Sequence, residues 1–295
     1  MTPKEGKGEN LQLLIEAVDN SEISTIKSIV RGIFKIINDP RSSAKELKEL
    51  IEVDPPLTSK LLKIANSAYY SLQRRISDIE QAIVLIGFDE LKELALSQKV
   101  CEVFAKGEAV HAYSRPALWE HSLAVASMAK MIFRKEFGLK GDDAYAAGLV
   151  HDIGIIIEDQ FLHRQFGDLL LQVHTEGKAL IEAELDAFGF DHAEIGRALF
   201  RHWSFPLDFV DSIARHHEEM PSPLASEPLV LTLFIANHAC LVHDIGYADS
   251  HPLTGDTYRR CLTALQIEPS SVNMIVEEVK SEIGEIRKRG LFSNG

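Results

Sequence analysis

Cysteine is scarce in this chain, and its placement excludes two kinds of small-protein scaffold. The 295 residues include three cysteines, Cys101, Cys240 and Cys261, and no two of them form a CxxC pair. A zinc ribbon needs such pairs, and a disulfide framework needs more cysteines at closer spacing. We therefore expect three reduced thiols and a fold that depends on its apolar core.

Long apolar runs and an excess of positive charge are also missing. No stretch approaches the roughly 18 uninterrupted apolar residues that a membrane-spanning helix needs. Residues 1–10 are polar and lack the apolar core of a signal peptide. The net charge of −13 disfavours the phosphate backbone of nucleic acids as a partner. We expect a cytoplasmic protein that binds neither membranes nor nucleic acids.

Patterns typical of β-strands are scarce, whereas apolar residues at helical spacing recur along the whole chain. Such residues follow three- and four-residue steps over residues 26–37 and again over residues 272–286. Ser43 and Glu46 have the spacing of a capping box, and Asp54 stands before Pro55 at another helix start. The sequence predicts an all-α fold built from many helices.

A polar stretch between Gly107 and Pro116 separates two helical blocks. We place a subdomain boundary there and expect a flexible N-terminus over residues 1–19. A first helical subdomain is then predicted over residues 20–112, and a second over residues 113–290.

The best candidate for a functional site begins with the adjacent residues His151 and Asp152. They fall in the last turn of a predicted helix that Asp142 or Asp143 can cap and that Gly154 is expected to end. An imidazole and a carboxylate then project from one helix end. A divalent transition metal favours such a mixed set of ligands.

Further imidazoles are available from other predicted helices. His121 lies one turn inside a helix, His192 follows a helix cap at Asp191, and the pair His216 and His217 follows an apolar helical run. These side chains could instead be solvated at a helix start or act as cations at a helix end, and the sequence leaves both alternatives open. The predicted metal ligands are His121, His151, Asp152, His192, His216 and His217.

Over residues 114–245 this series resembles the ligand set of the HD metal-dependent phosphohydrolase superfamily. The preceding block, with LLKIANSAYY at residues 61–70 and IEQAIVLIG at residues 79–87, is similar to the first half of the HDOD family, a branch of that superfamily. Together the two resemblances cover about residues 20–285. They imply a two-part helical protein used in bacterial signal transduction, often without demonstrated catalysis.

The chain departs from the pattern of these families at three places. The last ligand is usually an aspartate, and the matching position here is Asn237, whose neutral amide is a poorer ligand. The lysine that can bind phosphate after the His-Asp pair is Ile155 here. The Gly-Tyr-Pro signature expected after the last histidines is replaced by Glu219, Met220 and Pro221. The resemblance therefore does not support hydrolysis of cyclic diguanylate.

Two other features have open interpretations. The hexapeptide Leu-Val-His-Asp-Ile-Gly occurs at residues 149–154 and again at residues 241–246. The second copy contains His243 and Asp244, which have no partners at the family's spacing, so we interpret it as a chance repetition. The run that contains Asn66, Tyr69 and Tyr70 could be a recognition surface or a site of tight helix packing.

The resemblance implies a regulatory module with a retained His/Asp site for one or two divalent ions, with iron or manganese favoured and zinc or nickel possible. Its expected partner is a signalling protein or a small phosphorylated ligand. The alternative is a metal-dependent phosphohydrolase that acts on a phosphomonoester or phosphodiester. A third possibility is a protein-interaction scaffold without a metal.

Overall fold

The computed structural model describes residues 3–67, 70, 75–104, 109–110, 113–217, 227–247 and 255–289. These residues form helices and one isolated β-bridge between Val110 and Tyr113, with no strand among them, which confirms the predicted all-α fold. No helix in this part of the chain is long and apolar enough to cross a membrane.

The elements, in chain order, are α1 (Pro3–Asp19), the 3-10 helix η1 (Glu22–Ile26), α2 (Lys27–Asn38), α3 (Ala44–Glu52), α4 (Pro55–Ala65), α5 (Ile79–Ile86), α6 (Phe88–Phe104), α7 (Arg115–Phe137), α8 (Asp142–Val150), α9 (Ile153–Phe161), α10 (His163–Glu176), α11 (Leu180–Phe188), α12 (His192–His202), α13 (Leu207–Ala214), α14 (Pro228–Val242), α15 (Gly255–Leu265) and α16 (Pro269–Arg289).

The chain divides into two compact units. One comprises Met1–Ser21 and Phe104–Ile283, and the other comprises Glu22–Val103 and Gly284–Gly295. The boundaries that we placed at residues 19/20 and 112/113 remain predictions about domains.

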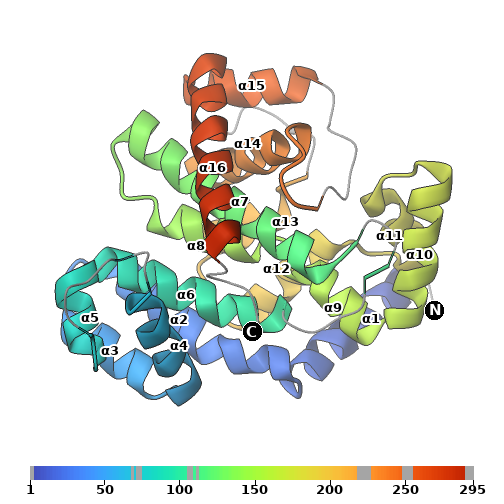
Figure 1. The fold of residues 1–295 in the computed structure, drawn as a ribbon. Coiled ribbons are helices and arrows are strands. Elements are labelled where there is room, and N and C mark those ends of the chain that lie inside the picture. The colour runs from blue at the N-terminus through green and yellow to red at the C-terminus, as the bar shows by residue number, and fades with distance from the viewer. Residues whose placement is uncertain are drawn as a thin grey trace. The chain divides into compact units, whose positions relative to one another are not determined.

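The larger unit is built around α7, which packs against α8 and α14 (Figure 1). A Cβ atom added at Gly148 of α8 would lie 2.5 Å from Ala126 Cα of α7, so these two helices approach closely because one residue is a glycine. Helices α12, α13 and α14 pack in succession, and α9 packs against α12. These helices carry the candidate site residues.

Caps mark several helix ends in this unit, and the cap predicted at Asp191 is confirmed. Ser114 caps α7 through a bond from Ala117 N, and Gly138 ends that helix in the left-handed conformation, with φ 66°. Asp191 caps α12 by accepting a bond from Glu194 N.

Two predicted helix ends near the candidate site are wrong. The N-cap of α8 is Gly141, with φ 75°, so Asp142 and Asp143 lie in the first turn of the helix. Carboxylates at this position interact favourably with the positive end of the helix dipole. Gly154 does not end a helix but lies inside α9. A close approach of another backbone, described below, is the physical reason for glycine there.

The N-terminus also differs from the prediction. Instead of a flexible segment over residues 1–19, the described residues from Pro3 to Asp19 form α1. Leu14, Ile15 and Val18 are buried on one face of this helix, and α1 packs against α12. Burial of that apolar face stabilises the helix.

The smaller unit contains α2 to α6, with α3 packed against α2, α4 and α5. Ser43 and Glu46 form the predicted capping box, and Asp54 caps α4. Asn66 hydrogen-bonds both the N–H and the carbonyl of Ile76, each at 2.8 Å. This residue therefore joins two ends of a loop, whereas Tyr69 lies outside the described residues.

Candidate metal centre

The centre of the site is Asp152, which lies at the corner between α8 and α9. His151 is the C-cap of α8, and Asp152 precedes the first residue of α9. Both side chains are buried, with 0% and 1% of their surface exposed. A buried carboxylate needs compensating partners, because desolvation of an isolated charge is costly.

Four imidazoles from other positions in the chain surround the two oxygens of Asp152. Oδ2 lies 3.1 Å from His151 Nε2 and 3.8 Å from His121 Nε2. Oδ1 lies 3.2 Å from His216 Nε2 and 3.7 Å from His192 Nε2. His121 comes from α7, His192 is the first residue of α12, and His216 follows α13. The corner between α8 and α9 thus lies where three other elements deliver an imidazole.

In all four rings, Nδ1 faces an oxygen acceptor on the side away from Asp152. These pairs are His151 with Gly148 O at 2.8 Å, His216 with Ile213 O at 2.6 Å, His121 with Ile245 O at 3.2 Å and His192 with both Glu184 oxygens at 2.9 Å. Carbonyl and carboxylate oxygens can only accept, so Nδ1 donates in each case. In the neutral ring, the lone pair is then on Nε2, which faces Asp152. A metal-binding histidine usually donates its other ring N–H to an oxygen acceptor in this way, which fixes the orientation and tautomer of the ring.

Several of these inward-facing atoms make no hydrogen bond within the described residues. They are His151 Nε2, His216 Nε2 and Asp152 Oδ1, all inaccessible to solvent. The nitrogen atoms lie at ion-pair distance from Asp152, but in the neutral ring each holds a lone pair and cannot donate a hydrogen bond to a carboxylate oxygen. Buried polar atoms left in this state require an explanation. A divalent metal fits them, because imidazole nitrogen and carboxylate oxygen are its usual ligands.

All six predicted ligands belong to two groups that share Asp152. The first group contains His192, His216 and His217, and the second contains His121 and His151; within each, the candidate atoms lie within 4.8 Å of one another. His217 is partly exposed, whereas the others are buried. The predicted residues therefore do come together, while their role as ligands remains a prediction.

The surroundings of His151, His217 and Asp152 favour the metal-binding ionisation form of each of these three side chains. Burial lowers the pKa of His151, and burial together with neighbouring His216 lowers the pKa of His217 well below its usual value. Burial by itself would raise the pKa of Asp152, but the facing imidazoles of His151 and His216 bring it well below the usual value. Near neutral pH, the neutral forms of His151 and His217 and the ionised form of Asp152 are thus favoured.

Two glutamates behind His192 were missed by the sequence analysis. Glu184 of α11 is fully buried and accepts bonds from the backbone N–H and Nδ1 of His192. Glu158 of α9 is also fully buried, and burial and the charge of Glu184 raise its pKa well above the usual value. Burial and the neighbouring Glu184 therefore favour the protonated form of Glu158. The sequence contained a signal for the burial of Glu184, because its spacing places it on the same face of α11 as the apolar residues Leu180 and Ala183.

The second copy of the hexapeptide supports His121 instead of forming another site. The carbonyl of Ile245 accepts the bond from His121 Nδ1. A Cβ atom at Gly246 would lie 2.4 Å from His121 N, so only glycine allows this approach. His243 and Asp244 belong to neither ligand group in the described part of the chain.

Asn237, on α14, also contacts His121. Its Oδ1 lies 2.8 Å from His121 Nε2, and only 2% of the residue is exposed. Both ring nitrogens of His121 therefore have polar partners, which distinguishes this ring from His151 and His216.

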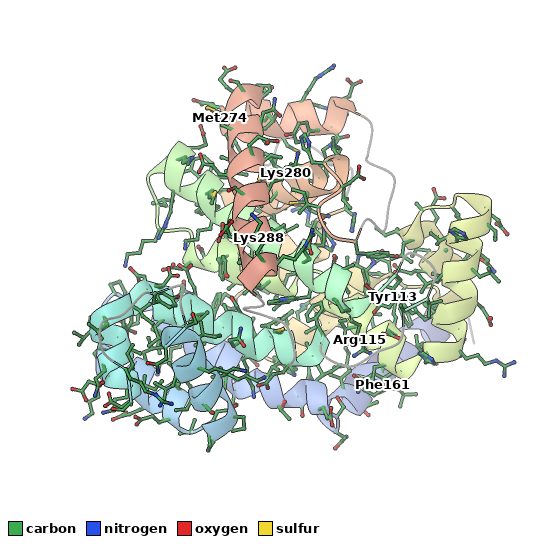
Figure 2. The ribbon with its side chains drawn as sticks, in the orientation of Figure 1. Tyr113, Arg115, Phe161, Met274, Lys280 and Lys288 are labelled. Carbon is green, nitrogen blue, oxygen red and sulfur yellow. The ribbon has the colours of Figure 1, made fainter. Side chains whose placement is uncertain are left out.

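A buried ion pair joins the start of α7 to α9. Asp159 accepts bonds from Arg115 Nε at 2.6 Å and from Tyr113 Oη at 2.9 Å. Figure 2 shows Tyr113 and Arg115 beside the end of α9 that carries Phe161. This pairing connects the element that carries His121 to the one that follows Asp152.

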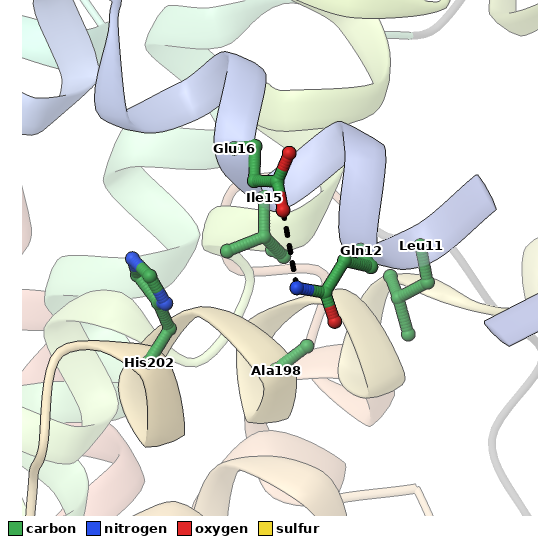
Figure 3. A pocket seen from close by; sticks show the side chains of 6 residues that line it. All are labelled: Leu11, Gln12, Ile15, Glu16, Ala198 and His202. Atoms are coloured by element: carbon green, nitrogen blue, oxygen red, sulfur yellow. Dashed lines mark hydrogen bonds between the residues drawn. The ribbon is translucent and has the colours of Figure 1, made fainter. Parts of the chain in front are cut away.

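A pocket of about 170 Å³ lies between α1 and α12, away from the ligand atoms. Its lining residues are Leu11, Gln12, Ile15, Glu16, Ala198 and His202 (Figure 3). Gln12 and Glu16 are hydrogen-bonded to each other across one turn of α1. The pocket is open and contains none of the six candidate ligands.

The family model described as HDOD domain matches residues 23–219 of the chain. An HDOD domain protein of unknown function from Geobacter sulfurreducens is 30% identical, with a TM-score of 0.73 over 90% of this chain and 91% of that chain. The chain also spans 42% and 37% of the length of two curated relatives, from Treponema pallidum and Bacillus subtilis.

Two further solved structures show the same fold at lower identity. One, named as a proposed signal transduction protein from Marinobacter aquaeolei, is 18% identical, with a TM-score of 0.70 over 90% of this chain and 59% of that chain. The other, named as a proposed phosphohydrolase from Shewanella amazonensis, is 21% identical, with a TM-score of 0.64 over 95% and 96% of the two chains. At these identities the likeness concerns the fold alone.

Proposed function

The chain belongs to the HDOD domain family, and on this premise we propose that it is a signal-transduction module whose buried His/Asp site binds a divalent metal. The observation that supports the proposal most strongly is the arrangement around Asp152. Four imidazoles are oriented by hydrogen bonds that their Nδ1 atoms donate, so that their Nε2 atoms face the two oxygens of Asp152.

The candidate ligands are the six residues of the two groups, which share Asp152 and so offer two neighbouring metal positions. Imidazole and carboxylate together suit iron, manganese, zinc or nickel, and among these we favour iron or manganese. A bound ion joins the helices that carry its ligands and, with an open coordination position, lowers the pKa of a bound water. In the regulatory role, the first of these effects is sufficient.

The regulatory role is supported by what surrounds the His-Asp pair. Ile155, at the position where the resemblance expects a phosphate-binding lysine, is an apolar side chain with no exposed surface. The net charge of −13 also opposes the approach of a phosphodiester. The partner that we propose is a signalling protein or a small phosphorylated ligand, and we further propose a cytoplasmic setting and no role in nucleic-acid binding.

A second candidate function is metal-dependent hydrolysis of a phosphomonoester or phosphodiester. The geometry of Asp152 favours this function, because its two oxygens face separate groups of imidazoles. A carboxylate that bridges two metal ions has the same arrangement, and two-metal sites are common in phosphoester hydrolysis. The Shewanella relative is named as a proposed phosphohydrolase.

The proposal is tested by comparing the metal content of Asp152→Ala with that of Asp244→Ala. Both changes remove one aspartate from a copy of the same hexapeptide, so the second is a matched control. After expression without a histidine tag in metal-replete medium, Asp152→Ala should lose most of its metal and Asp244→Ala should retain it. Equal losses, with both variants folded by circular dichroism, would mean that the metal is bound elsewhere.

Cyclic diguanylate hydrolysis is expected to be absent or very weak in metal-loaded protein. A phosphodiester needs a positioned cation beside the metal, and Ile155 provides none. The measurement is chromatography of the nucleotide after incubation with excess protein. Linearisation at about 1 per second or faster, an ordinary enzymatic rate, would favour the phosphohydrolase function instead.

A further inference from the structure

The two oxygens of Asp152 face ligand groups that are not equivalent. Oδ1 faces His192 and His216, and His217 belongs to the same group. Among the residues that the structure describes, Oδ2 faces His151 and His121. Including Asp152, the first group offers four donors and the second offers three. Because metal sites in proteins usually have at least three protein ligands, the second position depends on every one of its members.

His121 is the member of the second group whose donor atom already has a partner. Its Nδ1 donates to the carbonyl of Ile245, so the lone pair of the neutral ring is on Nε2. That atom lies 2.8 Å from the side-chain amide of Asn237. The oxygen and NH2 group of an amide have nearly the same shape, and a half-turn presents the NH2 group to Nε2. The His121 lone pair then accepts a hydrogen bond from Asn237.

The surroundings stabilise this hydrogen bond. Asn237 and His121 are both almost wholly buried, on helices α14 and α7 that pack against each other. An ion that recruited His121 would leave the buried amide without its partner, which is unfavourable in a site closed to water. A neutral amide also brings no charge to offset that of a second cation.

We propose that the site binds one ion, through Asp152, His192, His216 and His217, and that the hydrogen bond between Asn237 and His121 prevents occupation of the second position. The inference rests on the proposed metal-binding function and specifies its stoichiometry. With His121 engaged, the second position retains, among the described residues, His151 Nε2 and Asp152 Oδ2, which are too few ligands.

The test is the number of ions per chain in untagged protein after manganese loading and gel filtration, by elemental analysis. Wild-type protein should contain about one ion, and Asn237→Asp should contain about two, because the carboxylate adds a ligand and releases His121. Asn237→Asp combined with His121→Ala should return to about one ion. Asn273→Asp, which adds the same charge at an exposed position of α16, is the matched control and should also contain one ion.

Each other result has a distinct meaning. Two ions in the wild type would overturn the inference and leave metal binding intact, and one ion in Asn237→Asp would show that Asn237 is not the obstacle. Less than about 0.1 ion in every protein would overturn metal binding itself, and the inference with it.

A second measurement needs no variant and so does not depend on the folding of Asn237→Asp. The electron paramagnetic resonance spectrum of the manganese-loaded wild type should have the hyperfine pattern of an isolated ion at all manganese concentrations. The pattern of two exchange-coupled ions would contradict the proposal.

Discussion

Glu184 is a fully buried carboxylate whose two oxygens lie 2.9 Å from His192 Nδ1. It also accepts a bond from the backbone N–H of the same residue. Two donors of His192 thus depend on one side chain from another helix. This arrangement fixes both the start of α12 and the tautomer of the imidazole.

Glu184→Gln should weaken metal binding about 10- to 100-fold, as is typical when a partner behind a metal ligand is changed. Glutamine has one acceptor oxygen for two donors, and it has no charge to favour protonation of Nδ1. Competition with a chelating dye measures the affinity. Glu182→Gln, at an exposed position of the same helix, is the control. Equal affinities of the two variants would contradict a positioning role for Glu184.

The histidine series could be predicted from the sequence. The oxygen atoms that accept hydrogen bonds from the Nδ1 atoms of these histidines could be predicted only in part. His151 and His216 each donate to a carbonyl three residues earlier, which is a local consequence of their position at a helix end. His121 instead uses Ile245, far along the chain. Such long-range pairs depend on how helices pack, and a single sequence contains little information about that.

The corner between α8 and α9 depends on how closely the neighbouring helix approaches. A Cβ atom at Gly154 would lie 2.0 Å from the carbonyl oxygen of His192, at the start of α12. From the sequence, Gly154 was expected to end a helix, because glycine often ends helices. In the structure, glycine is needed at this point inside α9 for packing. Sequence alone does not distinguish these two uses of glycine.

Gly154→Ala should lower the free energy of unfolding by about 1–3 kcal/mol, because the added methyl group must displace the backbone of α12. Gly167→Ala is the matched change in α10, where a Cβ atom would meet nothing within 4 Å. It should raise stability by about 0.5–1 kcal/mol, since alanine is the better helix former. Urea denaturation measures both effects. Destabilisation of the same size in both variants would mean that the close approach is not the cause.

Most of the predicted helix starts are confirmed. Ser43, Asp54 and Asp191 cap helices as expected, because a side-chain cap is a local interaction. The N-terminal helix α1 was missed, since its first half is polar and the apolar residues of its second half gain stability from packing on α12.

Over the whole molecule, the three cysteines lie in the interior. Cys101, Cys240 and Cys261 are free thiols, and all three are buried. Burial raises the pKa of Cys101 and Cys240 to about 12 and that of Cys261 to about 11. We therefore expect these three thiols to react slowly as well as to be reduced, because the thiolate is the reactive form of cysteine.

An aromatic disulfide reagent at about neutral pH should label no cysteine of the folded protein within an hour and all three in denaturant. Absorbance of the released thiolate gives the count. Rapid labelling of any cysteine in the native protein would show that its surroundings open readily to solvent.

The central claim is that Asp152 and the imidazoles around it bind a divalent metal. Anomalous diffraction from crystals of untagged protein, recorded on both sides of the absorption edge of the metal present, tests it most directly. We predict an anomalous peak in contact with Asp152 and the Nε2 atoms of His192 and His216. A peak at His243 and Asp244, or no peak in crystals grown from metal-replete protein, would contradict the account.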